Sequence, residues 1–205
     1  MPNTFGFDMQ DPRGQLAAMA RELYGRGAFT SLGGNLSIRV SGLDAAWITP
    51  SGVFKGGLNP EDMVRIDLKA RMVGGAPGLA PSVEAAVHAA IYRSRKDVGA
   101  VIHAHPPHAI VVATLDLPIE CVIDEALPYA EIPRLGYFPP GSDALVDAVS
   151  EAMAGSDLVM LAHHGLFAAG PNLRAAANHL LGLESTCQVL LLMRQHAQGH
   201  LPVIP

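Results

Sequence analysis

The sequence VGAVIHAHPPH, residues 98–108, contains the pattern that decides the fold around it. Its apolar part, from Val98 to His103, predicts a buried strand, which Pro106 ends at once. Alternate residues of a strand face the same side, so His103 and His105 project together at a sheet edge. Paired imidazoles there favour a metal site, although two partly exposed histidines in a strand-to-loop turn give the same pattern.

A second apolar strand, DLVMLA at 157–162, also runs into histidine and a glycine turn, HHG at 163–165. Catalytic zinc sites typically have three protein ligands and keep one position open. Two strand ends that supply two histidines and one histidine match that count. Because neighbouring strand residues point to opposite faces, we expect His164 to join the metal ligands and His163 to support them by a hydrogen bond.

A carboxylate, Glu84, lies in the first turn of a predicted helix that Ser82 caps and that reaches about Arg95. The helix dipole stabilises a carboxylate at this position, so Glu84 is either a simple dipole partner or a functional group. His88, one helical turn later, is expected only to pack or hydrogen-bond there, and His108 has the same structural interpretation.

Two turns of small residues adjoin predicted strands, at residues 33–37 (GGNLS) and 49–52 (TPSG). Backbone N–H groups and hydroxyls in such turns bind phosphate. Ordinary tight turns use the same residue types, so the pattern alone leaves both readings open. Lys55 lies close by in sequence, where it would either assist such a site or be an ordinary surface lysine.

The remaining periodicity predicts alternating helices and strands in one domain that spans residues 1–205. Helices are expected at 12–24, 82–95, 107–115, 142–154 and 172–196, strands at 36–40, 45–49, 64–68, 98–103 and 157–162, a loop at 74–82, and irregular chain at 116–141. This alternation indicates a layered α/β domain, and the early hairpin excludes a purely parallel sheet.

The composition limits the class of protein. Apolar residues make up 49% and charged residues 16% of the 205, which excludes a disordered chain and indicates some apolar surface. A net charge of −5 without a dense Lys/Arg run gives no reason to expect nucleic acid or a membrane as partner. Two isolated cysteines suggest a cytoplasmic protein, and residues 1–15 lack the pattern of a secretory signal.

Five motifs in order, with a sixth phrase, resemble the class II aldolase/adducin family, and within it the L-fuculose-1-phosphate aldolase branch. The motifs are GNLS at 34–37, ITPSG at 48–52, PSVE at 81–84, HAH at 103–105 and HHG at 163–165, and the phrase is YFPPGS at 137–142. The resemblance extends from about residue 12 to 195. It implies a single three-layer α/β/α domain with a central, largely antiparallel mixed sheet.

The resemblance also implies a set of site residues. The family's zinc ligands map onto His103, His105 and His164, and its catalytic glutamate, which also ligates the metal when no substrate is bound, maps onto Glu84. Its substrate-phosphate contacts map onto Gly34, Asn35, Ser51, Gly52, Ser82 and the backbone of Val83. Val83 itself replaces a serine that aldolases often have. Family members are usually cyclic homotetramers with active sites between subunits.

The implied reaction is cleavage of a ketose 1-phosphate to dihydroxyacetone phosphate and an aldehyde, through a metal-stabilised enediolate with Glu84 as general acid/base. The family also contains methylthioribulose-1-phosphate dehydratases, sugar-acid-phosphate decarboxylases and pentulose-phosphate 4-epimerases. Epimerases tend to carry Asp in place of Glu84 and Ser in place of Pro106, so both positions favour an aldolase. The retained histidines and Glu84 argue against a non-catalytic scaffold like the head domain of adducin.

The proline-rich segment 117–140 is the sequence's own argument for an oligomer. It carries several aliphatic residues, namely Ile119, Val122, Ile123, Leu127 and Leu135. We expect them to pack against a neighbouring chain, whereas the alternative is that the segment folds back over its own sheet.

Overall fold

The structure is a computed structural model that describes residues 11–197 and 199–204. Residues 1–10, in which no secretory signal is expected, lie outside this part. The described helices are α1 (Pro12–Gly25), α2 (Ala85–Ser94), α3 (Pro107–Thr114), α4 (Asp143–Ala152) and α5 (Leu173–His196), with short 3-10 turns η1 (Lys55–Gly57), η2 (Pro60–Asp62) and η3 (Asp124–Tyr129). None of these helices is long and apolar enough to cross a membrane.

One mixed sheet runs through the described chain, in the strand order β4-β3-β2-β1-β5-β8-β7-β6. Its strands are β1 (Asn35–Arg39), β2 (Ala45–Ile48), β3 (Val64–Asp67), β4 (Met72–Gly75), β5 (Ala100–Ala104), β6 (Arg134–Leu135), β7 (Leu158–Leu161) and β8 (Gly165–Gly170). Neighbouring strands are antiparallel except for the parallel pair β6–β7. This confirms the predicted largely antiparallel sheet.

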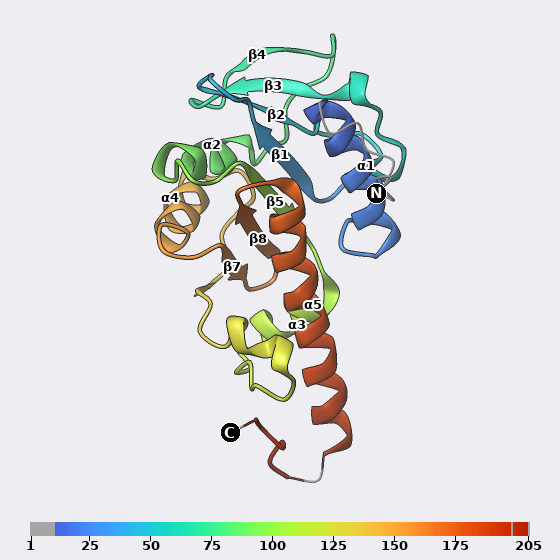
Figure 1. Cartoon of the computed structure of the whole chain (residues 1–205), viewed down its shortest axis with the longest axis vertical. Helices are drawn as coiled ribbons and strands as arrows, with labels where there is room; N and C mark the ends of the chain where they lie inside the picture. The colour runs from blue at the N-terminus through green and yellow to red at the C-terminus, as the bar shows by residue number, and fades with distance from the viewer. Residues whose placement is uncertain (1–10, 198, 205) are drawn as a thin grey trace, which may run out of the picture.

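Helices cover both faces of the sheet, which gives the predicted three layers (Figure 1). Helices α1, α3 and α5 pack on one face, where β5 contributes Ala100, Ile102 and Ala104. Helices α2 and α4 pack together on the other face, to which β5 presents Val101. By strand alternation His103 belongs to this second face, the same face as α2.

Several element boundaries differ from the sequence prediction. Strand β8 was not predicted, and β4 overlaps the predicted loop at 74–82. Helix α2 begins at Ala85 with Glu84 at its N-cap, so the prediction that Ser82 caps it was wrong. A β-bridge between Pro50 and Pro81 holds the chain extended up to that point, which prevents an earlier helix start.

The segment 116–141 folds back onto its own chain to a large extent, contrary to our expectation. Ile119 is buried in the core beneath it, and β6 pairs with β7. Val122, Ile123 and Leu135 are half-buried. Only Leu127 of the five aliphatic residues is exposed, at 56%. The segment therefore gives a weaker argument for an oligomer than its composition suggested.

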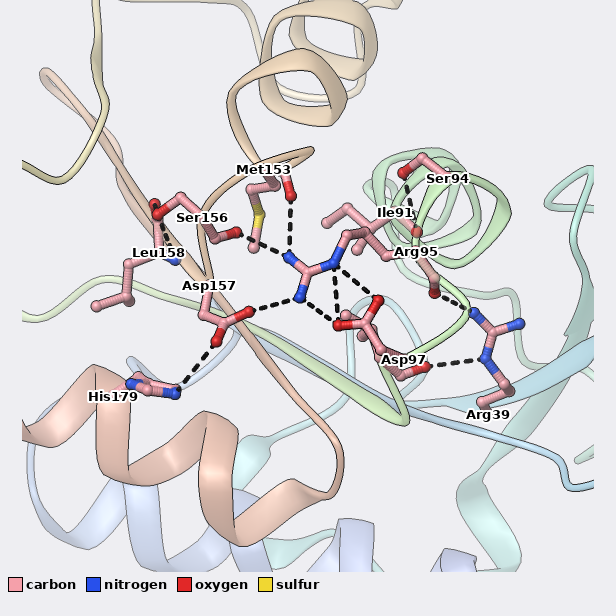
Figure 2. Close-up of polar contacts among 11 residues, drawn as sticks. Arg39, Ile91, Ser94, Arg95, Asp97, Met153, Ser156, Asp157, Leu158 and His179 are labelled. Carbon is pink, nitrogen blue, oxygen red and sulfur yellow. Dashed lines mark hydrogen bonds and ion pairs between the residues drawn. The ribbon is translucent and has the colours of Figure 1, made fainter.

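A single arginine, Arg95 at the C-terminal end of α2, joins this helix to the end of α4 and the start of β7 (Figure 2). Its guanidinium donates to the carbonyl oxygens of Met153 and Ser156 at 3.1 and 3.2 Å, and to a carboxylate oxygen of Asp157 at 2.8 Å. Asp97 accepts a further pair of its hydrogen bonds. These contacts fix the end of α4 and the start of β7 against α2, and β7 leads directly to the histidine turn.

Candidate active site

Three histidines predicted as metal ligands lie together in the structure. His103 is on β5 and fully buried, His105 directly follows that strand, and His164 lies in the turn between β7 and β8. One ring nitrogen from each lies within 4.8 Å of the other two. The Nε2 atoms of His103 and His105 are 2.9 Å apart.

Strand pairing and two glycines allow this close approach. Ala104 on β5 pairs with Leu166 on β8, so the turn before β8 lies beside His105. A Cβ atom on Gly165 would lie 2.1 Å from the Ala104 carbonyl oxygen. A Cβ atom on Gly33 would lie 2.7 Å from Nδ1 of His105. Neither position accommodates a side chain, so both glycines serve the packing of His105.

Glu84 completes the cluster from the turn before α2. Its Oε2 atom lies 3.2 Å from Nε2 of His103, and its Oε1 atom lies 3.2 Å from Nε2 of His164. The side chain is 4% exposed and makes no capping hydrogen bond to its helix. The structure thus places the carboxylate among the histidines, where helix capping alone would not direct it.

The charge states of the cluster suit a cation. Burial lowers the pKa of His103 to about 3, and burial also lowers the pKa of His105, so both rings are neutral near pH 7. Burial alone would raise the pKa of Glu84, but the neighbouring imidazoles and the Asn35 amide lower it to about 2.

The donor set fits a divalent metal ion. Nδ1 of His103 donates to the Leu166 carbonyl oxygen at 3.0 Å, which leaves Nε2 as a bare lone pair facing the cluster. Oε1 of Glu84 and Nδ1 of His164 are buried without a hydrogen-bond partner. Three imidazoles and one carboxylate that converge in this way form the ligand set typical of zinc and other divalent transition metals.

The predicted phosphate-contact residues lie on segments that run next to this cluster. The Pro50–Pro81 bridge, with a 2.9 Å hydrogen bond from the Ser51 N–H to the Ala80 carbonyl, brings residues 50–52 beside residues 80–83. Register on the sheet sets Asn35 directly opposite His103. Gly34 precedes Asn35, and Gly52 follows Ser51 in its turn. Residues 34–35 are therefore next to His103, and residues 50–52 adjoin the segment that leads into Glu84.

Individual side chains in this region differ in what they contact. Ser82 is buried and its hydroxyl accepts from the Glu84 N–H at 3.3 Å, whereas Val83 is 65% exposed. The Asn35 amide donates to Oε2 of Glu84 at 2.8 Å and accepts from His88 at 2.7 Å. Its side chain is thus directed at the glutamate rather than into an open turn.

Two sequence-based interpretations were wrong. His163 was expected to support the metal ligands, but its side chain is exposed, and the contact described for it is a backbone N–H donated to Thr114 Oγ1. Lys55 was treated by default as a surface lysine, but it is 1% exposed and donates to the Pro50 carbonyl at 2.9 Å. Burial lowers the pKa of Lys55 to about 8.

The three-layer fold and this histidine and glutamate cluster define a class of α/β protein with a buried group of side chains that could hold a divalent cation. The family model for the class II aldolase and adducin N-terminal domain matches residues 14–191. The chain therefore belongs to the class II aldolase and adducin family, whose fuculose-phosphate aldolases it resembles.

Named relatives cover more than one activity. The chain is 32% identical to an L-fuculose phosphate aldolase of Methanococcus maripaludis, over 85% of this chain and 93% of that one. It is also 32% identical to a probable bifunctional methylthioribose-1-phosphate isomerase/methylthioribulose-1-phosphate dehydratase of Nocardia farcinica. That match covers 91% of this chain but only 37% of the longer relative.

A solved structure agrees with the fold. The crystal structure of L-fuculose-1-phosphate aldolase from Thermus thermophilus superposes with a TM-score of 0.79. The match covers 93% of this chain and 99% of that chain, at 29% identity. The relatives named here process phosphorylated sugars, so phosphorylated sugars are the substrates with which this site should be tested.

Proposed function

We propose that this protein is a zinc-dependent aldolase that cleaves a ketose 1-phosphate, similar to L-fuculose 1-phosphate, into dihydroxyacetone phosphate and an aldehyde. The observation that carries the proposal is the position of Glu84. An ionised, buried carboxylate lies 3.2 Å from two of three converging imidazoles, close enough to transfer protons at a substrate held by the same cluster. A cytoplasmic location, which the sequence favours, belongs to the same proposal.

Each side chain has a defined part in the proposed reaction. His103, His105 and His164 hold the divalent cation, which when bound supplies Lewis-acid stabilisation of negative charge developing on substrate oxygen. Glu84 accepts the proton from the substrate hydroxyl as the carbon–carbon bond breaks. It then returns a proton to the carbon left by cleavage, so the carboxylate ends ionised as it began. The Asn35 amide keeps one of its oxygens oriented.

Gly34, Asn35, Ser51, Gly52, Ser82 and the backbone of Val83 are proposed to form the phosphate-binding pocket. The support is their placement on two adjoining segments beside the cluster. Lys55 lies behind these segments with its ammonium on the Pro50 carbonyl, so it holds the turn that carries Ser51. Backbone N–H groups and hydroxyls would make the direct contacts, because the exposed Val83 offers no side-chain donor.

A screen of ketose 1-phosphates tests this function directly. The zinc-loaded protein is expected to release dihydroxyacetone phosphate from at least one of them, measured by coupled reduction of that product. The corresponding unphosphorylated ketoses, compared through release of the aldehyde that both kinds of substrate yield, are expected to react at least about tenfold more slowly, since charge-assisted hydrogen bonds to the phosphate would be lost. Equal rates on both kinds of substrate would contradict the pocket, and no release from any ketose phosphate would contradict the aldolase.

A dehydratase acting on methylthioribulose 1-phosphate is the second candidate. It is favoured by the Nocardia farcinica relative, whose match spans 91% of this chain. A decarboxylase of sugar-acid phosphates or a pentulose-phosphate 4-epimerase would use the same cluster. The same screen separates the dehydratase and the epimerase, because loss of water and epimerisation occur without release of dihydroxyacetone phosphate. Decarboxylation of a 3-oxo-tetronate 4-phosphate, the activity named for a relative from Pectobacterium atrosepticum, also gives dihydroxyacetone phosphate together with carbon dioxide, so release of the aldehyde coproduct separates the aldolase from a decarboxylase.

We further propose a homotetramer with the site near a subunit boundary. Apolar side chains are exposed on the segments around the cluster: Val83 at 65%, Leu32 at 59% and Tyr137 at 59%. Light scattering at micromolar concentration is expected to give about four times the mass of one chain. Replacing Val83 by glutamate is expected to lower that mass, because a charge would be buried at the contact. A fully active particle of monomer mass would contradict the proposal.

A further inference from the structure

A row of buried polar side chains leads from Glu84 into the core between α2 and the sheet. The Asn35 amide lies 2.8 Å from Oε2 of Glu84 and its oxygen lies 2.7 Å from Nε2 of His88. Nδ1 of His88 lies 2.7 Å from the Ser37 hydroxyl, which lies 2.8 Å from the Tyr92 hydroxyl. Each member is at most 4% exposed, so water does not reach the row.

The hydrogen bond from Asn35 to Glu84 sets the direction of the other bonds in this row. The Asn35 NH₂ group donates to Glu84, so the Asn35 oxygen faces His88 and accepts from it. His88 therefore donates from Nε2. Burial lowers the pKa of His88 to about 4, so the ring is neutral and its Nδ1 is an acceptor.

The remaining two bonds follow from that tautomer. The Ser37 hydroxyl must donate to Nδ1 of His88, which leaves the Ser37 oxygen to accept from the Tyr92 hydroxyl. If the Asn35 amide were flipped, its oxygen would face a carboxylate oxygen of Glu84, and its NH₂ group would face the Nε2–H of His88. Neither contact would then be a hydrogen bond. Only one arrangement satisfies all five side chains, so the row has a single direction that ends at Glu84.

We propose that His88 is a positioning residue whose donated hydrogen bond locks the Asn35 amide and thereby fixes the orientation of the Glu84 carboxylate toward His103 and His164. The proposal rests on the proton-transfer role proposed for Glu84, but its structural half is independent of the substrate. His88 itself touches neither the carboxylate nor the three clustered imidazoles through a described hydrogen bond.

The surroundings of His88 argue against a role in packing alone. The neighbouring buried residues of α2 are apolar apart from Tyr92, which belongs to the same row: Ala85, Val87, Ala89, Ala90 and Ile91. An apolar side chain at position 88 would fill the space without any need for a buried partner. The His88 ring also lies edge-on to Phe167, with 6.0 Å between the ring centroids, and Phe167 stacks on His103 at 4.3 Å. His88 is therefore next to two residues that contact the cluster: Asn35, which binds Glu84, and Phe167, which stacks on His103.

The first test is the tautomer of His88. Nitrogen-15 NMR of zinc-loaded protein labelled in histidine is expected to show one ring with a protonated Nε2 and a bare Nδ1 that is absent from the His88→Gln spectrum. This pattern should persist at about pH 6, where an ordinary histidine is substantially protonated. A ring with the proton on Nδ1 would overturn the proposal, because the Asn35 oxygen would then have no donor.

The second test separates positioning from packing by kinetics. His88→Phe is expected to lower kcat by about tenfold or more with a smaller change in KM, the usual effect of losing a residue that orients a metal-site group. His88→Gln, which keeps a donor near the Nε2 position, should recover most of kcat. Val87→Ala, a cavity in the same helix, should leave kcat unchanged. Equal losses in the Phe and Gln variants, or a wild-type kcat in the Phe variant, would overturn the proposal.

Two further measurements keep the result clear. If His88→Phe fails to fold, Ser37→Ala removes the donor to Nδ1 of His88 together with the acceptor for Tyr92, and kcat should still fall without a change in KM; an unchanged kcat would overturn the proposal. If no ketose phosphate is cleaved by the wild-type protein, the visible spectrum of the cobalt(II)-loaded protein replaces kcat. It should change in His88→Phe and not in Val87→Ala, since displacing Glu84 alters the surroundings of two ligand imidazoles. An unchanged cobalt spectrum would overturn the positioning role whether or not the aldolase assignment holds.

Discussion

Replacement of Glu84 by glutamine is expected to lower turnover by at least about a hundredfold, the lower end of a general acid/base contribution. Glutamine has the same shape and still accepts from Asn35 through its amide oxygen, so the fold and most of the bound metal should remain. What is lost is the group that takes and returns the proton. Steady-state kcat on the ketose phosphate found by the screen, with metal content measured on the same sample, gives the result.

A matched control for this variant exists in the same chain. Glu184 is also partly buried and paired with a histidine, since its Oε1 lies 2.7 Å from Nδ1 of His108. It also accepts the backbone N–H groups of His108 and Ala109 at the start of α3, which is a structural function. Glu184→Gln should therefore reduce thermal stability slightly and leave kcat near the wild-type value. Near-normal turnover in Glu84→Gln would reduce Glu84 to a structural residue of the helix start.

The closeness of His103 and His105 could be predicted because strand alternation is a local rule. His103 and His105 share a face whatever the rest of the chain does, and a proline stop places them at an edge. His164 depends on longer-range structure, because its predicted strand, β7, is not a neighbour of β5. Strand β8 pairs with both and brings the turn that carries His164 beside His105. Strand β8 itself was missed because GLFAAG, with a glycine at each end and no β-branched residue, has a weak strand signal.

The hydrogen-bonded row behind Glu84 could not be predicted, since its members come from two distant parts of the chain. Asn35 and Ser37 alternate along β1, while His88 and Tyr92 are one turn apart on α2. The spacing within each element places its two side chains on one face. The sequence does not show that this face of β1 packs against this face of α2. For the same reason the contact between the Asn35 amide and Glu84 was not predicted.

Replacing all three clustered histidines by alanine is expected to abolish metal binding and activity together. The wild-type protein should bind close to one zinc ion per chain by elemental analysis, and the triple variant close to none, because Glu84 alone is a weak site. His163→Ala is the matched control. It removes a histidine adjacent to His164 whose exposed side chain lies outside the cluster, so its zinc content should equal that of the wild type.

Thermal unfolding gives an independent measure of the same site. A ligand at about a thousand times its Kd stabilises the folded state by about 4 kcal/mol. For a chain of this size each kcal/mol corresponds to about 2–4 °C, so zinc should raise the Tm of the wild type by roughly 8–16 °C. The triple variant should show no such rise, even if its own Tm differs because the buried His103 ring no longer stacks on Phe167. Full zinc content and an undiminished shift in that variant would place the metal elsewhere in the molecule, and the proton-transfer role of Glu84 would then lose its basis as well.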